Sequence, residues 1–165
     1  MHSRKNSDWK KMLVATLVFA FFGLAMMSCN NPSYYEHDEA IKNNIWCYED
    51  AKAFEFEIKD SLLAFNFYIN VRNTVDYEFA NLYFFIQSEL PDGSFAQDTV
   101  ECQLADYRGK WLGEGRGQLR DNSFILRKNM RFQKNGKYRF LLKQGMRRDS
   151  LKGISDVGIR LEKVN

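Results

Sequence analysis

Cys29 is the residue of this 165-residue chain whose surroundings specify a chemical modification most clearly. It follows the small Ser28 and an apolar run from Met12 to Met27, and four basic side chains precede that run. A basic start, a short apolar segment and a small residue at the cleavage point describe a secretory signal peptide, too short for a membrane span. Cleavage directly before a cysteine is typical of bacterial lipoproteins, so we predict that Cys29 carries a lipid. An ordinary signal peptide and an uncleaved anchor are the alternatives.

Cys47 and Cys102 are the cysteines that remain if Cys29 is acylated. Outside the cytoplasm an even pair can form a disulfide, which stabilises a loop of this length by about 2–5 kcal/mol. Both residues also lie among apolar neighbours in segments with strand character, where a buried thiol serves as a small hydrophobic side chain. The sequence leaves both interpretations open.

Catalytic and metal-binding patterns are missing from the sequence that follows the leader. Its one histidine, His37, falls in a polar segment, where no rigid scaffold would hold the ring against a nucleophile. One histidine and two separated cysteines also fail the ligand number and spacing of a zinc site. The glycine-rich stretch from Gly109 to Gly117 matches neither nucleotide-binding signature, and no helix follows it. We therefore predict a non-enzymatic protein without cofactor, metal or nucleotide.

The charge of the chain argues against a nucleic-acid binder. The excess of three positive charges belongs to the predicted leader, residues 1–28, which holds four basic side chains and one acid. The remaining chain is formally neutral and lacks the basic field of such binders. Residues 29–44 show no sustained apolar period and are predicted to be a flexible tether. Residues 45–165 suit one domain with one core.

Two aromatic residues lie among four cations in the predicted domain. These six residues are Tyr107, Arg108, Lys110, Trp111, Arg116 and Arg120. Because tryptophan, tyrosine and arginine are typical interface anchors, we consider four of them candidate contacts for a partner protein or a glycan. These candidates are Tyr107, Lys110, Trp111 and Arg116. In the alternative, Trp111 fills the core and the cations are ordinary surface residues.

A period of two dominates from Ile45 onward and predicts strands that are apolar on one face and wet on the other. The expected strands cover residues 54–58, 63–71, 82–86, 95–104, 123–126, 137–142 and 157–161. About eight short strands separated by turns predict an all-β antiparallel β-sandwich of jelly-roll or immunoglobulin-like form. A closed barrel is the second choice.

Three local features refine this prediction. Residues 82–86 are apolar throughout and predict a central strand covered on both faces. The break at Asp60-Ser61 suits a hairpin turn between its flanking strands. Residues 90–94 carry a proline and a glycine where type I or II turns favour them.

Several segments of the C-terminal half together form a distinctive pattern. They are Leu104-Ala105-Asp106, Gly109-Lys110-Trp111-Leu112-Gly113, Gly136-Lys137-Tyr138-Arg139-Phe140, Gln144-Gly145-Met146-Arg147 and the run from Gly153 to Glu162. Trp46 and Tyr83 accompany them earlier in the chain, after the lipoprotein-like leader. With these features the chain resembles the GldH family of gliding-motility lipoproteins of the Bacteroidetes, over nearly its whole length.

The resemblance implies an accessory lipoprotein of the envelope machinery for gliding and the linked type IX secretion. Its expected partners are the membrane, through the lipid, and envelope proteins. Only Cys29, the acylation site, transfers residue by residue. Asn30 stands where aspartate would favour inner-membrane retention, so we expect the outer membrane, on its periplasmic face. The alternative function is a glycan-binding sandwich that uses Tyr107 and Trp111. A hydrolase of envelope polymers, the third hypothesis, requires two carboxylates that face each other across a cleft.

Overall fold

The structure is a computed structural model, and it describes residues 33–164. The elements of this part are β1 (Tyr35–Ala40), η1 (Lys42–Asn44), β2 (Ile45–Cys47), β3 (Lys52–Ile58), β4 (Ala64–Thr74), β5 (Asn81–Glu89), β6 (Phe95–Gln103), β7 (Leu119–Arg131), β8 (Gly136–Gln144), β9 (Ser150–Lys152) and β10 (Ile154–Lys163). Within residues 33–164, no helix combines the length and apolar character needed to cross a membrane. The predicted leader and Cys29 lie outside the described residues.

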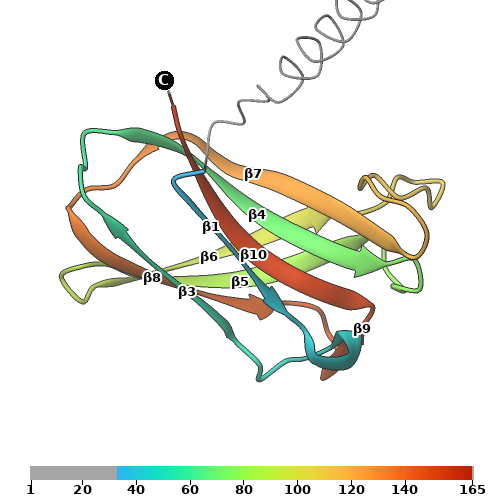
Figure 1. Cartoon of the computed structure of the whole chain (residues 1–165). Helices are drawn as coiled ribbons and strands as arrows, with labels where there is room; N and C mark the ends of the chain where they lie inside the picture. The colour runs from blue at the N-terminus through green and yellow to red at the C-terminus, as the bar shows by residue number, and fades with distance from the viewer. Residues whose placement is uncertain (1–32, 165) are drawn as a thin grey trace, which may run out of the picture. The chain divides into compact units, whose positions relative to one another are not determined.

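Two four-stranded antiparallel sheets pack against each other and form a β-sandwich (Figure 1). One sheet has the order β1-β10-β4-β7 and the other has the order β3-β8-β5-β6, while β2 and β9 form a separate short pair. When the eight long strands are numbered along the chain, the orders become 1-8-3-6 and 2-7-4-5, which is the arrangement of a jelly roll. The predicted all-β sandwich is confirmed. The sheets are open, so the second choice, a closed barrel, does not describe the fold.

The core lies between the two sheets and follows the period of two. β4 buries Phe65, Phe67, Ile69 and Val71, and β3 buries its alternate residues in the same way. Each fully buried side chain of this size contributes about 1.5–3 kcal/mol relative to exposure. Trp46 is fully buried on β2, and its indole N–H donates to the backbone oxygen of Asp50 at 2.7 Å. The hydrophobic pattern therefore decides which face of each sheet points inward.

Part of the segment predicted to be a tether is a strand of the sandwich. β1 pairs with β10 along its whole length, from Tyr35 opposite Leu161 to Ala40 opposite Asp156. β1 is an edge strand whose side chains are mostly exposed, so backbone hydrogen bonds hold it in place and no apolar period marks it in the sequence. The compact unit begins at Ser33 rather than at residue 45.

Two further local predictions need correction. β5 is an interior strand, as predicted, but only one of its faces is covered, since Phe84 is buried and Phe85 is 42% exposed. An antiparallel sheet of a two-layer sandwich leaves its outer face in water, which the apolar run could not reveal. The turn at Asp60-Ser61 does not close a hairpin, because β3 and β4 belong to different sheets. The turn at residues 90–94 does join the paired strands β5 and β6.

Candidate functional site

The loop between β6 and β7 presents Tyr107 on a tightly held turn. One carboxylate oxygen of Asp106 accepts hydrogen bonds from the backbone N–H groups of Arg108 at 2.8 Å and Lys110 at 2.9 Å. The backbone of Asp106 also donates to Lys110 and accepts from Gly109. Gly109 has a φ of 79°, which only glycine adopts without strain. The turn is therefore fixed in shape, and it holds the Tyr107 side chain 88% exposed.

The four candidate contacts of this loop do not share one environment. Tyr107, Lys110 and Arg116 are exposed, and the guanidinium of Arg108 lies 5.1 Å from the centre of the Tyr107 ring. Trp111 is half-buried and packs against the core, with its ring 6.5 Å from that of Tyr77. The alternative that Trp111 fills the core thus describes its environment better. Tyr107 is the more accessible ring of the pair on which the glycan hypothesis depends.

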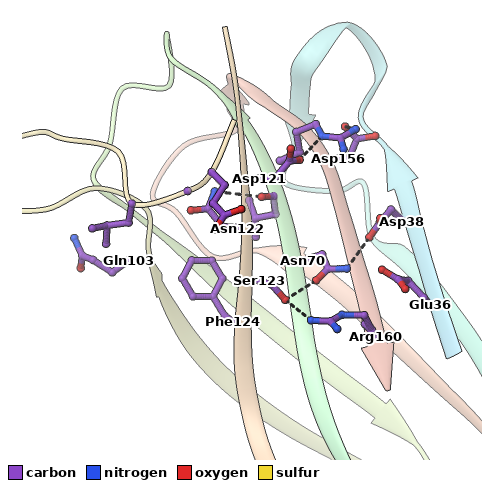
Figure 2. A pocket seen from close by; sticks show the side chains of 15 residues that line it. Glu36, Asp38, Asn70, Gln103, Asp121, Asn122, Ser123, Phe124, Asp156 and Arg160 are labelled. Carbon is purple, nitrogen blue, oxygen red and sulfur yellow. Dashed lines mark hydrogen bonds and ion pairs between the residues drawn. The ribbon is translucent and has the colours of Figure 1, made fainter. Parts of the chain in front are cut away.

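A polar pocket of about 690 Å³ adjoins this loop on the outer side of the sheet β1-β10-β4-β7 (Figure 2). Leu112, Gly113 and Glu114 of the loop contribute to its wall. The other lining residues come mainly from the four strands of the sheet. Loop and pocket therefore form one continuous surface.

A row of polar side chains crosses the pocket at one register position. Asp38, Gly158, Asn70 and Ser123 are opposite one another on β1, β10, β4 and β7. The Asn70 amide donates to Asp38 at 3.3 Å, and the Ser123 hydroxyl donates to the Asn70 oxygen at 2.9 Å (Figure 2). Gly158 makes this row possible, because a Cβ there would overlap the Asp38 carboxylate. The missing side chain lets Asp38 reach across β10 to β4.

Two arginines lie beside this row, and one of them pairs with two of the pocket's acids. Arg72 donates to Asp121 at 2.5 Å and lies 3.6 Å from Asp156. The hydrogen bond with Asp121 raises the pKa of the Arg72 guanidinium above its ordinary value. Arg160 donates to Ser123 at 2.9 Å, and its guanidinium lies 4.1 Å from the centre of the Tyr68 ring. Arg72 thus pairs with Asp121 and Asp156 together, which gives no support to these two acids as a pair of catalytic carboxylates.

The surface as a whole places opposite charges next to each other. The acids of the pocket are Glu36, Asp38, Glu114, Asp121 and Asp156. The loop beside it carries exposed Arg108, Lys110 and Arg116. Such an alternation of charge suits recognition of a partner surface with the complementary pattern.

Sequence reasoning found the loop but missed the pocket. Glu36 and Asp38 fell in the segment predicted to be a tether, so their strand was not considered. Asn70 and Arg72 are outward-facing residues in the alternating apolar and polar pattern of β4, and this pattern could have indicated them from the sequence. The partners of β4 come from distant parts of the chain, and no local pattern predicts that pairing.

Cys47 and Cys102 are free thiols in different environments. Cys47 is exposed on β2, whereas Cys102 is fully buried on β6. Burial raises the pKa of the Cys102 thiol to about 12. The structure contains no Cys47–Cys102 disulfide, and the buried-thiol interpretation fits Cys102 alone. In residues 33–164, no group of three or more His, Cys, Asp or Glu side chains is placed to hold a metal ion.

Comparison with known proteins identifies similar chains. A family model described as GldH lipoprotein matches residues 33–161. The chain is 31% identical over 156 residues to a protein of Christiangramia forsetii named gliding motility lipoprotein GldH homolog, with 90% of this chain and 95% of that protein covered. It is 27% identical over 146 residues to the gliding motility lipoprotein GldH of Flavobacterium johnsoniae, with 84% and 90% covered.

Among solved structures, a family GH115 4-O-methyl-α-glucuronidase, BtGH115A, contains a region of similar shape. It aligns with 84% of this chain and 19% of that protein, at a TM-score of 0.44 and 10% identity. At this level the likeness carries no argument about function.

Proposed function

Because the chain belongs to the GldH lipoprotein family, we propose that it is an envelope docking protein that binds a component of the gliding-motility or type IX secretion machinery. As a lipoprotein of this family it is membrane-anchored and non-catalytic. We further propose that Cys29 carries the lipid and that the loop 105–118 contacts the partner. The membrane is proposed to be the outer membrane, with the domain in the periplasm.

The anchor follows from the leader sequence. Acylation of the residue that becomes the mature N-terminus leaves the chain held by several acyl chains, and more than one chain is needed for stable anchoring. Asn30 after the cysteine supports the outer membrane, since aspartate there would favour inner-membrane retention.

The observation that carries the docking proposal is the exposure of Tyr107 on a turn that its neighbours hold rigid. Because the backbone of this turn is already ordered, little backbone entropy is lost when a partner covers the tyrosine. The basic loop and the acidic pocket on either side supply the charges that would orient such a partner. Arg116 and Lys110 extend the contact beyond the tyrosine.

Crosslinking in the native envelope tests this proposal. Tyr107→Ala should lower the recovery of motility or secretion proteins, because losing a contact worth about 2 kcal/mol weakens binding about thirty-fold, and adding Arg116→Ala should lower it further. Tyr48→Ala is the matched control, because Tyr48 is also exposed and lies 5.0 Å from Lys143 in the same kind of cation–π contact. Equal recovery with the Tyr107 and Tyr48 variants would refute docking through this loop. Recovery of glycans alone would favour the alternative function.

A further inference from the structure

An apolar groove of about 990 Å³ opens between β6 and β7, the edge strands on one side of the sandwich. Phe67 and Ile86 form buried parts of its lining. Phe132 and Tyr138 are also buried lining residues, and the half-buried ones include Leu90, Val100, Phe124, Leu126, Met130 and Phe140. A continuous apolar groove left open to water is typical of a binding surface.

β6 is an edge strand whose only charged residues are the acids Asp98 and Glu101. It pairs with β5 in an unbroken register from Asn81 opposite Gln103 to Glu89 opposite Phe95. Its nine residues include no proline, lysine or arginine. Its outer edge therefore offers a regular row of backbone donors and acceptors to another strand.

β7, on the other side of the groove, is protected. Its pairing with β4 shifts register twice, and Asn129 adopts a left-handed φ of 54°. Bulges and charged side chains are the devices that keep an edge strand from pairing. Arg127, Lys128 and Arg131 are exposed on this strand, so the β7 rim of the groove is basic. The two rims thus differ, and β6, whose register is unbroken, is better suited to accept a strand than β7.

One ion pair crosses the mouth of the groove. The guanidinium of Arg127 lies 3.3 Å from the Asp98 carboxylate, and the side chains are 67% and 58% exposed. Such an exposed pair contributes little and is readily exchanged for another acid. An incoming segment could therefore displace Asp98 and offer its own carboxylate to Arg127.

We propose that this groove binds an extended segment of a partner polypeptide, which adds as a strand to β6. Its alternate apolar side chains enter the groove, and an acidic residue pairs with the cations of β7. This inference rests on the proposed docking function and names the kind of segment that is recognised. A lipid chain would fill the groove but leave the free backbone edge of β6 unused, whereas an extended peptide satisfies both.

Peptide selection on the purified chain tests the proposal. The chain is produced without residues 1–28 and with Cys29→Ser, and the probe is a displayed library of random peptides of about ten residues, the length of a strand. Selected peptides should alternate apolar residues and carry an acid. Their binding should slow amide hydrogen exchange in residues 95–103.

Two variants on β6 form a matched pair. Val100→Glu should weaken peptide binding about ten-fold or more, because Val100 is opposite buried Phe84 and its replacement puts a carboxylate into the groove. Phe95→Glu introduces the same carboxylate at an exposed position of β6 that does not line the groove, and it should leave binding unchanged. Ala96→Trp, at an exposed position that lines the groove, gives a second blocking variant that does not disturb the core.

Each contrary result overturns the inference. The inference fails if the library yields no binder, or if the selected peptides leave amide hydrogen exchange in residues 95–103 unchanged. It also fails if the peptides still bind both blocking variants. Self-association of the chain that Ala96→Trp abolishes would assign the groove to a second copy instead. Tyr107→Ala must leave peptide binding intact, so failure of the groove and failure of the docking loop are separate outcomes.

Discussion

Replacing Gly158 by alanine should lower the free energy of unfolding by about 2 kcal/mol, within the range of about 1–3 kcal/mol that overpacking costs. A Cβ at this position would overlap the carboxylate of Asp38 and lie 2.7 Å from the backbone oxygen of His37. The carboxylate can rotate away if it gives up the 3.3 Å hydrogen bond from Asn70. The His37 oxygen cannot move without shifting β1 against β10. The loss of stability therefore has two parts, one from displacing the Asp38 side chain and one from shifting the β1 backbone.

A double-mutant cycle separates the two parts. Urea unfolding followed by tryptophan fluorescence gives the stability of each variant of the chain without residues 1–28 and with Cys29→Ser. Asp38→Ala alone should cost less than about 1 kcal/mol, because its hydrogen bond is exposed. In the Asp38→Ala background, Gly158→Ala should cost about 1 kcal/mol less than in the parent. An unchanged unfolding midpoint for Gly158→Ala, or strictly additive losses, would contradict the described packing.

Three further measurements test other parts of the structure. Asn122→Ala should lower the free energy of unfolding by about 1–3 kcal/mol in urea, because it leaves buried acceptors on β4 without their donor; a loss near zero would contradict this. Hydrogen bonds from Lys134 and then Ser94 hold the pKa of Asp92 below its ordinary 3.8, so its stabilisation is complete above that value and is lost as the pH falls. Asp92→Asn should therefore reduce the dependence of the urea midpoint on pH in the acid range, and an unaltered dependence would count against the ion pair. In the Cys29→Ser chain, a thiol reagent at mildly alkaline pH should modify Cys47 in the folded protein and Cys102 only after unfolding; two reactive thiols without denaturant would show that β6 is less buried than described.

The sequence predicted the elements whose side chains alternate between core and water. Phe54 to Ile58 and Phe65 to Val71 are buried at every second position, and this period indicated β3 and β4 directly. β1 was not predicted, because this exposed edge strand is held by backbone hydrogen bonds to β10, which lies more than a hundred residues later in the chain. The hairpin expected at Asp60-Ser61 failed for a related reason, since a turn signal does not tell which sheet the next strand joins.

The candidate surface was predicted in part. The aromatic and basic composition of residues 107–116 indicated an exposed contact, and Tyr107 matches it. Trp111 has the same composition around it but packs toward Tyr77, because the bridge between Ala105 and Trp111 turns this part of the loop toward the core. The polar row depends on Gly158, and this role can be recognised only when Asp38 is known to be its neighbour on the adjacent strand. Side-chain composition is local information, whereas strand pairing is not.

Mass spectrometry of the N-terminus of the protein purified from its native envelope is the decisive measurement for the lipid anchor. We expect a chain that begins at residue 29, with acyl groups on Cys29 and a membrane location that Cys29→Ala abolishes. A chain that begins elsewhere, or one whose residue 29 carries an unmodified thiol, would contradict it.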